Sequence, residues 1–173
     1  MRLGKEPKRV AEYILNLAQA DGKVLTPMQV LKLVYIAHGW LLGLDGRPLV
    51  NEPVEAWRYG PVIRSLYHQY KCYGSNPIDE FPTEKPNAFD AEEESTIGQV
   101  WKGYGNRTGI SLSSLTHQPG TPWDITVKQS GLGAVISNDL IEDYYHRLTV
   151  KPEREPAVSL EAQKEAVAIE HRI

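Results

Sequence analysis

The side chains best suited to covalent chemistry are His68 and Cys72, four residues apart, and His117 further along the chain. A spacing of four brings two side chains to one face of a helix, where a thiol and an imidazole would meet. A nucleophilic pair also needs an orienting group and donors for an oxyanion, and the neighbouring residue types provide neither. We therefore favour the commoner arrangement, a small buried cysteine beside a surface histidine.

Motifs for metals and cofactors are missing from the sequence. A single cysteine excludes a cysteine metal cluster, and no H-E-x-x-H, P-loop or G-x-G-x-x-G pattern is present. The stretch GYGNRTG at 103–109 has glycines and an arginine, but no strand pattern precedes it and no Lys-Ser/Thr follows it, so a helix end explains it better. We predict no catalytic residue, no metal site and no cofactor.

The stretch EAWRYGP holds residue types that recognise other proteins. Trp57, Arg58 and Tyr59 stand directly before a glycine-proline pair. These three types dominate the energetic centres of protein interfaces. Burying one such aromatic ring is worth on the order of 4–6 kcal/mol as an upper bound, so the same residues are candidates for closing the core.

A second stretch, SLSSLTHQPGTPW, joins a hydroxyl-rich segment to a proline-bracketed turn. Trp123 follows a proline and is a candidate anchor at a helix start, and His117 is placed to bond the last carbonyls of the preceding helix. Both residues are also candidates for contact with a partner.

Spacing of apolar residues predicts a mainly α fold, a single compact domain of about six to seven helices. The expected helices run from about 7 to 20, from Thr26-Pro27 to Asp45-Gly46, from Pro61 to Gly74, from Asp90 to Gly105, over a short stretch ending near Thr116, from Thr121-Pro122 to about Gln129, and from Ser137 through Leu148.

The helix expected after Thr26 is apolar nearly all round, which indicates a central, buried helix. Gly39 and Gly43 lie four residues apart on one side of it. Each costs about 1 kcal/mol relative to alanine, so a neighbouring element should pack closely there. His38 in the same helix is expected to be a hydrogen-bonded core residue.

Residues outside this helical pattern form an arm and a tail. Residues 47–59 contain two prolines and a short alternation, which predicts an extended arm or small hairpin. We expect a domain over 1–150, followed by a charged linker and a C-terminal amphipathic helix or flexible tail over 151–173.

Composition limits the class of protein. A length of 173 residues suits one self-sufficient domain, and one cysteine suits a reducing cytoplasm. We expect no membrane segment. With a net charge of −3, the small basic stripe Arg64, His68 and Lys71 does not favour DNA binding, and we interpret it as a solvated helix face.

Four ordered motifs together resemble the Panacea antitoxin-like domain, the family of phage-associated GepA-like and SocA-like proteins. The resemblance covers about residues 7–148. The motifs are Lys32, Leu33, Tyr35, Ala37, Gly39 and Trp40; Glu55-Ala56-Trp57 with Tyr59-Gly60-Pro61; Leu115-Thr116-His117; and Pro122-Trp123.

The resemblance implies a helical antitoxin of prophage-type toxin-antitoxin modules, without enzymatic activity, whose partner is a cognate toxin bound directly. A SocA-like member instead delivers its toxin to a cellular protease as an adaptor. A third possibility is a DNA-binding autoregulator of its own promoter.

The implied roles divide the motif residues into two sets. The structural set is Lys32, Tyr35, Gly39, Trp40, Gly60 and Pro61. The candidate partner-binding set is Trp57, Arg58, Tyr59, His117 and Trp123. Because residues shared among proteins with unrelated partners tend to define the fold, a scaffold role is favoured for Trp57 and Trp123, and the loop at 75–89 and the tail become further candidates for toxin contact.

Overall fold

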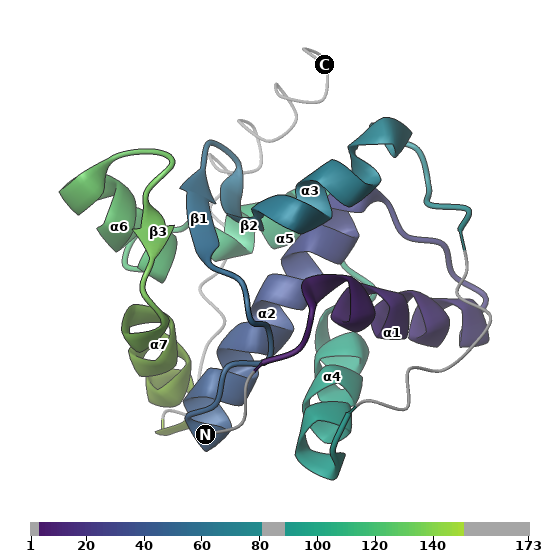
Figure 1. The fold of residues 1–173 in the computed structure, drawn as a ribbon, viewed down its shortest axis with the longest axis horizontal. Coiled ribbons are helices and arrows are strands. Elements are labelled where there is room, and N and C mark those ends of the chain that lie inside the picture. The colour runs from purple at the N-terminus through teal and green to yellow at the C-terminus, as the bar shows by residue number, and fades with distance from the viewer. Residues whose placement is uncertain (1–3, 81–88, 151–173) are drawn as a thin grey trace.

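Helix α2 (Pro27–Asp45) lies at the centre of the fold, and the other helices and a small sheet surround it (Figure 1). This computed structural model describes residues 4–80 and 89–150. The other helices are α1 (Pro7–Ala20), α3 (Arg64–Tyr70), the 3₁₀ helix η1 (Lys71–Tyr73), α4 (Ala91–Tyr104), α5 (Gly109–Thr116), α6 (Pro122–Ser130) and α7 (Asn138–Val150). The predicted mainly α fold and number of helices are confirmed for the described residues.

Helix α2 is central because its sequence leaves it no polar face. It begins at a capping box in which the Thr26 hydroxyl and the Gln29 side chain each bond the other residue's backbone N–H. Helices α1, α4, α5 and α7 pack against its sides. Near its end the helix emerges from the core, where Leu44 is 56% exposed although the apolar character of the helix predicts burial.

The two glycines of α2 admit helix α7, as their spacing predicts. A Cβ atom built on Gly39 would lie 2.1 Å from the ring of Tyr145. One built on Gly43 would lie 2.7 Å from the backbone nitrogen of His146. The ring of Trp40 also meets Tyr145, at 5.3 Å between ring centroids. Helix α7 therefore packs against α2 at a separation that only glycine permits.

His38 is the buried polar link between α2 and two other segments. Its Nδ1 accepts the backbone N–H groups of Leu49 (3.2 Å) and Val50 (3.3 Å), so its Nε2–H donates to Asn138 Oδ1 at 3.0 Å. Burial lowers the pKa of His38 to about 4, although the bond to Asn138 acts in the opposite direction. The expected hydrogen-bonded core histidine is confirmed.

The sheet consists of β1 (Val54–Trp57), β2 (Gly60–Ile63) and β3 (Val135–Ile136) in the order β2-β1-β3. Strands β1 and β2 form a small hairpin as predicted, but its second strand lies beyond the predicted range of 47–59, and the expected helix start at Pro61 is wrong. Pro61 lies in β2 opposite Ala56, and α3 begins at Arg64. A proline is tolerated there because β2 is an edge strand.

Two of the segments discussed above lie outside the described residues, namely most of the loop at 75–89 and the predicted linker and terminal helix over 151–173. Within the described part of the chain, none of the helices is long and apolar enough to cross a membrane.

Candidate partner-binding site

Three helices hold the turn of the hairpin through its backbone carbonyls. Strand β1 ends at Trp57, Arg58 and Tyr59 form a two-residue turn, and β2 begins at Gly60. The bonds run from Ser113 Oγ on α5 to the Tyr59 carbonyl (2.7 Å), from Lys32 Nζ on α2 to the Pro61 carbonyl (2.9 Å), and from Trp123 Nε1 on α6 to the Trp57 carbonyl (2.7 Å). The turn and its flanking strand residues are thus bonded to α2, α5 and α6, while Arg58 remains exposed.

Lys32 lies directly beneath the turn. The residue is only 1% exposed, and its Nζ donates to the carbonyl of Pro61. Burial lowers the pKa of Lys32 to about 7, because a charged ammonium loses its hydration there. Lys32 is a polar residue on a mostly apolar helix, and its role is to support the hairpin from below through this hydrogen bond.

Gly60 fits this position for two reasons. Its φ of +105° lies in the region that favours glycine. A Cβ atom on it would lie 2.8 Å from Lys32 Nζ and 3.1 Å from Thr116 Oγ1. Gly60 therefore lets the hairpin approach α2 and α5 closely enough for the lysine to reach its acceptor.

Trp123 supports the other side of the turn, and His117 packs against Trp123. Trp123 lies in the first turn of α6, where Thr121 is the N-cap, and His117 follows the last residue of α5. The two rings lie 5.3 Å apart in an edge arrangement. The proline-bracketed segment between α5 and α6 thus brings Trp123 to the hairpin, with His117 packed beside its ring.

Trp123→Phe is expected to lower the free energy of unfolding by about 1–3 kcal/mol, because the part-buried carbonyl of Trp57 loses the Trp123 donor. Trp40→Phe is the matched control, since its indole N–H makes a longer bond of 3.3 Å to Tyr104. Equilibrium urea unfolding measures both variants. Equal losses would show that the bond to the hairpin contributes nothing of its own.

The indole of Trp57 faces α3, which the sequence does not predict. Its ring lies 4.9 Å from that of Tyr67, and the guanidinium of Arg64 stands 5.7 Å from the ring centroid. Glu55 joins these groups: it accepts from Trp57 Nε1 at 2.7 Å and from Arg64 through two bonds of 2.8 and 3.1 Å. The Arg64 and Trp57 donors lower the pKa of the Glu55 carboxyl, so it stays ionised.

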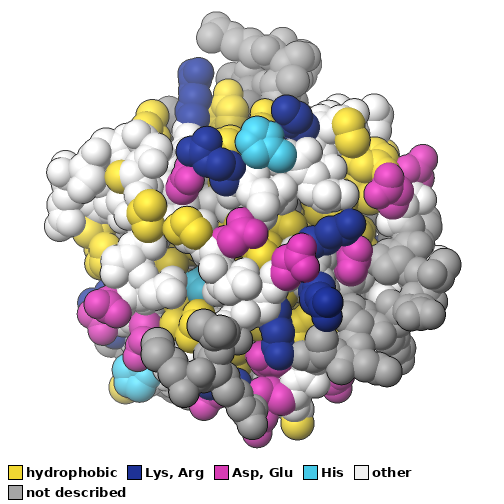
Figure 2. Space-filling model, viewed as in Figure 1, with side chains coloured by type: hydrophobic (Ala, Val, Ile, Leu, Met, Phe, Trp, Pro, Cys, Tyr) yellow, Lys and Arg dark blue, Asp and Glu magenta, His cyan; other side chains and the backbone are white. Residues whose placement is uncertain are grey.

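At the surface, these groups form one edge of the molecule. Figure 2 shows Lys and Arg side chains and a histidine beside hydrophobic side chains where the hairpin and α3 lie. The alternation along β1 correctly places Glu55 and Trp57 on one side. Tyr59 does not continue that alternation, because it lies in the turn, where the Arg58 guanidinium stacks 5.6 Å from its ring centroid.

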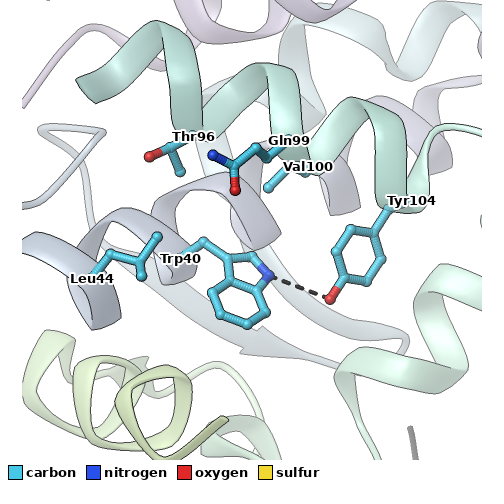
Figure 3. A pocket seen from close by; sticks show the side chains of 6 residues that line it. All are labelled: Trp40, Leu44, Thr96, Gln99, Val100 and Tyr104. Atoms are coloured by element: carbon cyan, nitrogen blue, oxygen red, sulfur yellow. Dashed lines mark hydrogen bonds between the residues drawn. The ribbon is translucent and has the colours of Figure 1, made fainter. Parts of the chain in front are cut away.

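The remaining motif residues lie away from the hairpin. Tyr35 and Trp40 pack against Tyr145 of α7, and Trp40 lines a groove of about 210 Å³ between α2 and α4 (Figure 3). The groove is lined by Trp40, Leu44, Thr96, Gln99, Val100 and Tyr104. Its walls are mostly apolar and include no histidine, carboxylate, cysteine or lysine, so they provide packing surface and no acid–base pair.

The cysteine lies differently from the sequence-based interpretation. Cys72 is exposed on η1, because the 3₁₀ turn after α3 points it away from the core, and His68 is exposed as well. The expectation of a buried cysteine is wrong. Across residues 4–80 and 89–150, no group of three or more His, Cys, Asp and Glu side chains is placed to hold a metal ion.

This arrangement defines a class of protein, a helical scaffold that fixes an aromatic and basic hairpin at its surface. The chain belongs to the antitoxin SocA-like family with a Panacea domain, whose sequence model matches residues 30–124. It is 30% identical over 156 residues to antitoxin SocA of Caulobacter vibrioides (strain NA1000 / CB15N), an alignment that covers 81% of this chain and 82% of that protein. No solved structure matches the chain.

The matched region coincides with the parts that hold the hairpin. It begins in α2 just before Lys32 and ends in α6 just after Trp123. Ser113, the third anchor, lies between them. The family motif therefore spans the hairpin together with its three hydrogen-bonding supports.

Proposed function

We propose that this protein is the antitoxin of a prophage-type toxin-antitoxin module and that it acts in the cytoplasm by binding its cognate toxin directly. Family membership and the likeness to antitoxin SocA support the antitoxin role. The protein acts here as a binding partner and makes or breaks no covalent bond in the toxin.

One observation supports the hairpin turn as the contact site. Arg58 is exposed at a turn whose flanking carbonyls bond to α2, α5 and α6. A turn fixed before binding loses little conformational entropy when a partner arrives, which favours tight association. Trp57 and Tyr59 flank or form the same turn, Trp123 bonds to it, and His117 packs against Trp123, so these residues supply aromatic contact area.

Co-expression tests the proposal. The protein encoded beside this gene is produced with and without the antitoxin, and growth and co-purification are followed. We expect arrest by the neighbour alone, relief by the antitoxin, and recovery of both proteins in one complex. Continued arrest with no complex would refute the proposed function.

Arg58→Ala is expected to weaken neutralisation while leaving thermal stability unchanged, because its described contact is an exposed stack on Tyr59. Loss of an arginine at the energetic centre of an interface raises Kd at least about tenfold. Trp57→Ala is the comparison, and it should lower both the melting temperature and neutralisation, since that ring packs on Tyr67. Unchanged toxin affinity in Arg58→Ala would make the hairpin purely architectural.

Delivery to a protease is the second candidate, because the family resemblance implies SocA-like members that act as such adaptors. The toxin's half-life distinguishes the two. Under direct masking it is unaffected by the antitoxin, whereas an adaptor shortens it only when the cellular protease is present.

A further inference from the structure

The exposed side of α3 is a continuation of the hairpin and not an isolated solvated face. The sequence places Arg64, His68 and Lys71 along one stripe. The structure packs Tyr67 of the same helix against Trp57, and Tyr67 meets His68 edge to face with 5.5 Å between ring centroids. Hairpin and helix therefore form one surface, which we call the hairpin–α3 surface. It consists of Trp57, Arg58, Arg64, Tyr67, His68 and Lys71.

The charged side chains of this surface are mostly positive. Between Val54 and Tyr73 the chain has three arginines and lysines and a single carboxylate, Glu55. Glu55 is only 8% exposed and is held by Arg64, so the charges that reach solvent are positive. The surface ends beyond η1, where Asp79 and Glu80 lie beside Tyr73. This excess of positive charge contrasts with the net charge of −3 of the whole chain.

The apolar part of the surface is fixed before a partner arrives. Trp57 is held on three sides, by its bond to Glu55, by the Tyr67 ring and by Arg64. Tyr67 itself is 38% exposed. Two rings held at one angle, bordered by cations, form a rigid strip that accepts an apolar edge and pairs with acidic groups around it.

We propose that the hairpin–α3 surface docks an acidic face of a partner protein, in which carboxylates surround a small apolar centre. The inference rests on the proposed function in that this partner is the toxin. The partner's carboxylates pair with Arg58, Arg64 and Lys71, and its apolar centre covers Trp57 and Tyr67. Such complementarity sets the rate of encounter and the choice of partner.

A protein fits this surface better than a nucleic acid does. Proteins that hold DNA through its phosphates commonly make about 6–10 such contacts along the backbone. The hairpin–α3 surface offers three arginines and lysines, and one of them, Arg64, is already engaged by Glu55. Its centre is occupied by packed aromatic rings.

Charge reversal tests the inference, with the product of the reading frame adjacent to this gene as the probe. Arg58→Glu and Lys71→Glu are each expected to raise Kd about tenfold or more, and the double variant about a hundredfold. Lys102→Glu, an exposed position on α4, is the matched control and should stay within about twofold. Thermal melting must be unchanged in all three single variants.

Salt dependence gives a second measurement. Wild-type affinity should fall as NaCl rises from about 50 to about 300 mM, and the double variant should lose most of that dependence. Binding by the wild type that neither reversal weakens would overturn this inference and leave the proposed function intact. No binding by the wild type would overturn both. Tighter binding of a promoter duplex, lost in the same variants, would replace the protein partner by DNA.

Discussion

Gly43→Val is expected to lower the free energy of unfolding by about 3 kcal/mol or more, the upper end of the usual cost of overpacking. The added Cβ would lie 2.6 Å from the Tyr145 Cβ and 2.7 Å from the backbone of His146. Backbone atoms cannot rotate aside as a flexible side chain can, so α7 itself must move. The displacement would also disturb the Tyr145 ring, which packs on Trp40.

Gly98→Ala is the matched control, because it also replaces a glycine inside a helix. No atom lies within 4 Å of the Cβ that would be added at Gly98. Alanine should therefore stabilise α4 by up to about 1 kcal/mol through its higher helix propensity. Urea unfolding monitored by circular dichroism measures both variants. A neutral Gly43→Val would mean that α7 does not pack against α2 as described.

The parts of the fold that sequence analysis predicted correctly depend on local chemistry. Thr26 and Asp90 each start a helix through a capping box, and Gly46 ends α2 with a positive φ. These interactions involve residues within four positions of one another, so they are visible in the order of residue types alone.

The sequence-based predictions are wrong where the same residue type is compatible with two kinds of secondary structure. Proline is favoured in the first turn of a helix and tolerated on an edge strand, and at Pro61 only the pairing with β1 decides between them. Strand β3, two residues long, was not predicted, because it forms only where α6 and α7 bring it beside β1. Long-range pairing of this kind is absent from any window of sequence.

The sequence indicates residue types suited to a binding site, but not how these residues are connected in the fold. Trp57, Arg58 and Tyr59 were recognised from their chemistry. Their link to Trp123 spans 66 residues and depends on how α6 packs. The role of Lys32 was equally hidden, because a lysine on an apolar helix gives no indication of which carbonyl it will reach.

The buried amine of Lys32 is expected to have the second large effect: the free energy of unfolding should rise with pH. Its pKa is about 7 in the folded protein against the ordinary 10.5. Between these values the unfolded chain holds a proton that the folded protein has released, so the free energy of unfolding increases as pH rises. The slope approaches about 1.4 kcal/mol per pH unit, and the gain is largest from about pH 7 to about pH 9.5.

Above about pH 10 the free energy of unfolding falls again, which limits the pH range of the measurement. Burial raises the pKa of Tyr35 and of Tyr145, so above about pH 10 the unfolded chain ionises first and stability falls. The measurement should therefore compare urea unfolding at about pH 7 and about pH 9. His38 acts below this window, since its pKa of about 4 costs stability only as pH falls below about 6.5.

Lys32→Met isolates the effect, because methionine keeps an unbranched side chain and removes the titrating amine. It should abolish most of the rise between about pH 7 and about pH 9, while Lys102→Met, at an exposed position, should keep it. The variant also leaves the Pro61 carbonyl without its donor, at a cost of about 1–3 kcal/mol at every pH, so the slope and not the absolute stability is decisive. Parallel pH profiles for wild type and Lys32→Met would show that another group titrates, and that Lys32 does not support the hairpin as a buried amine.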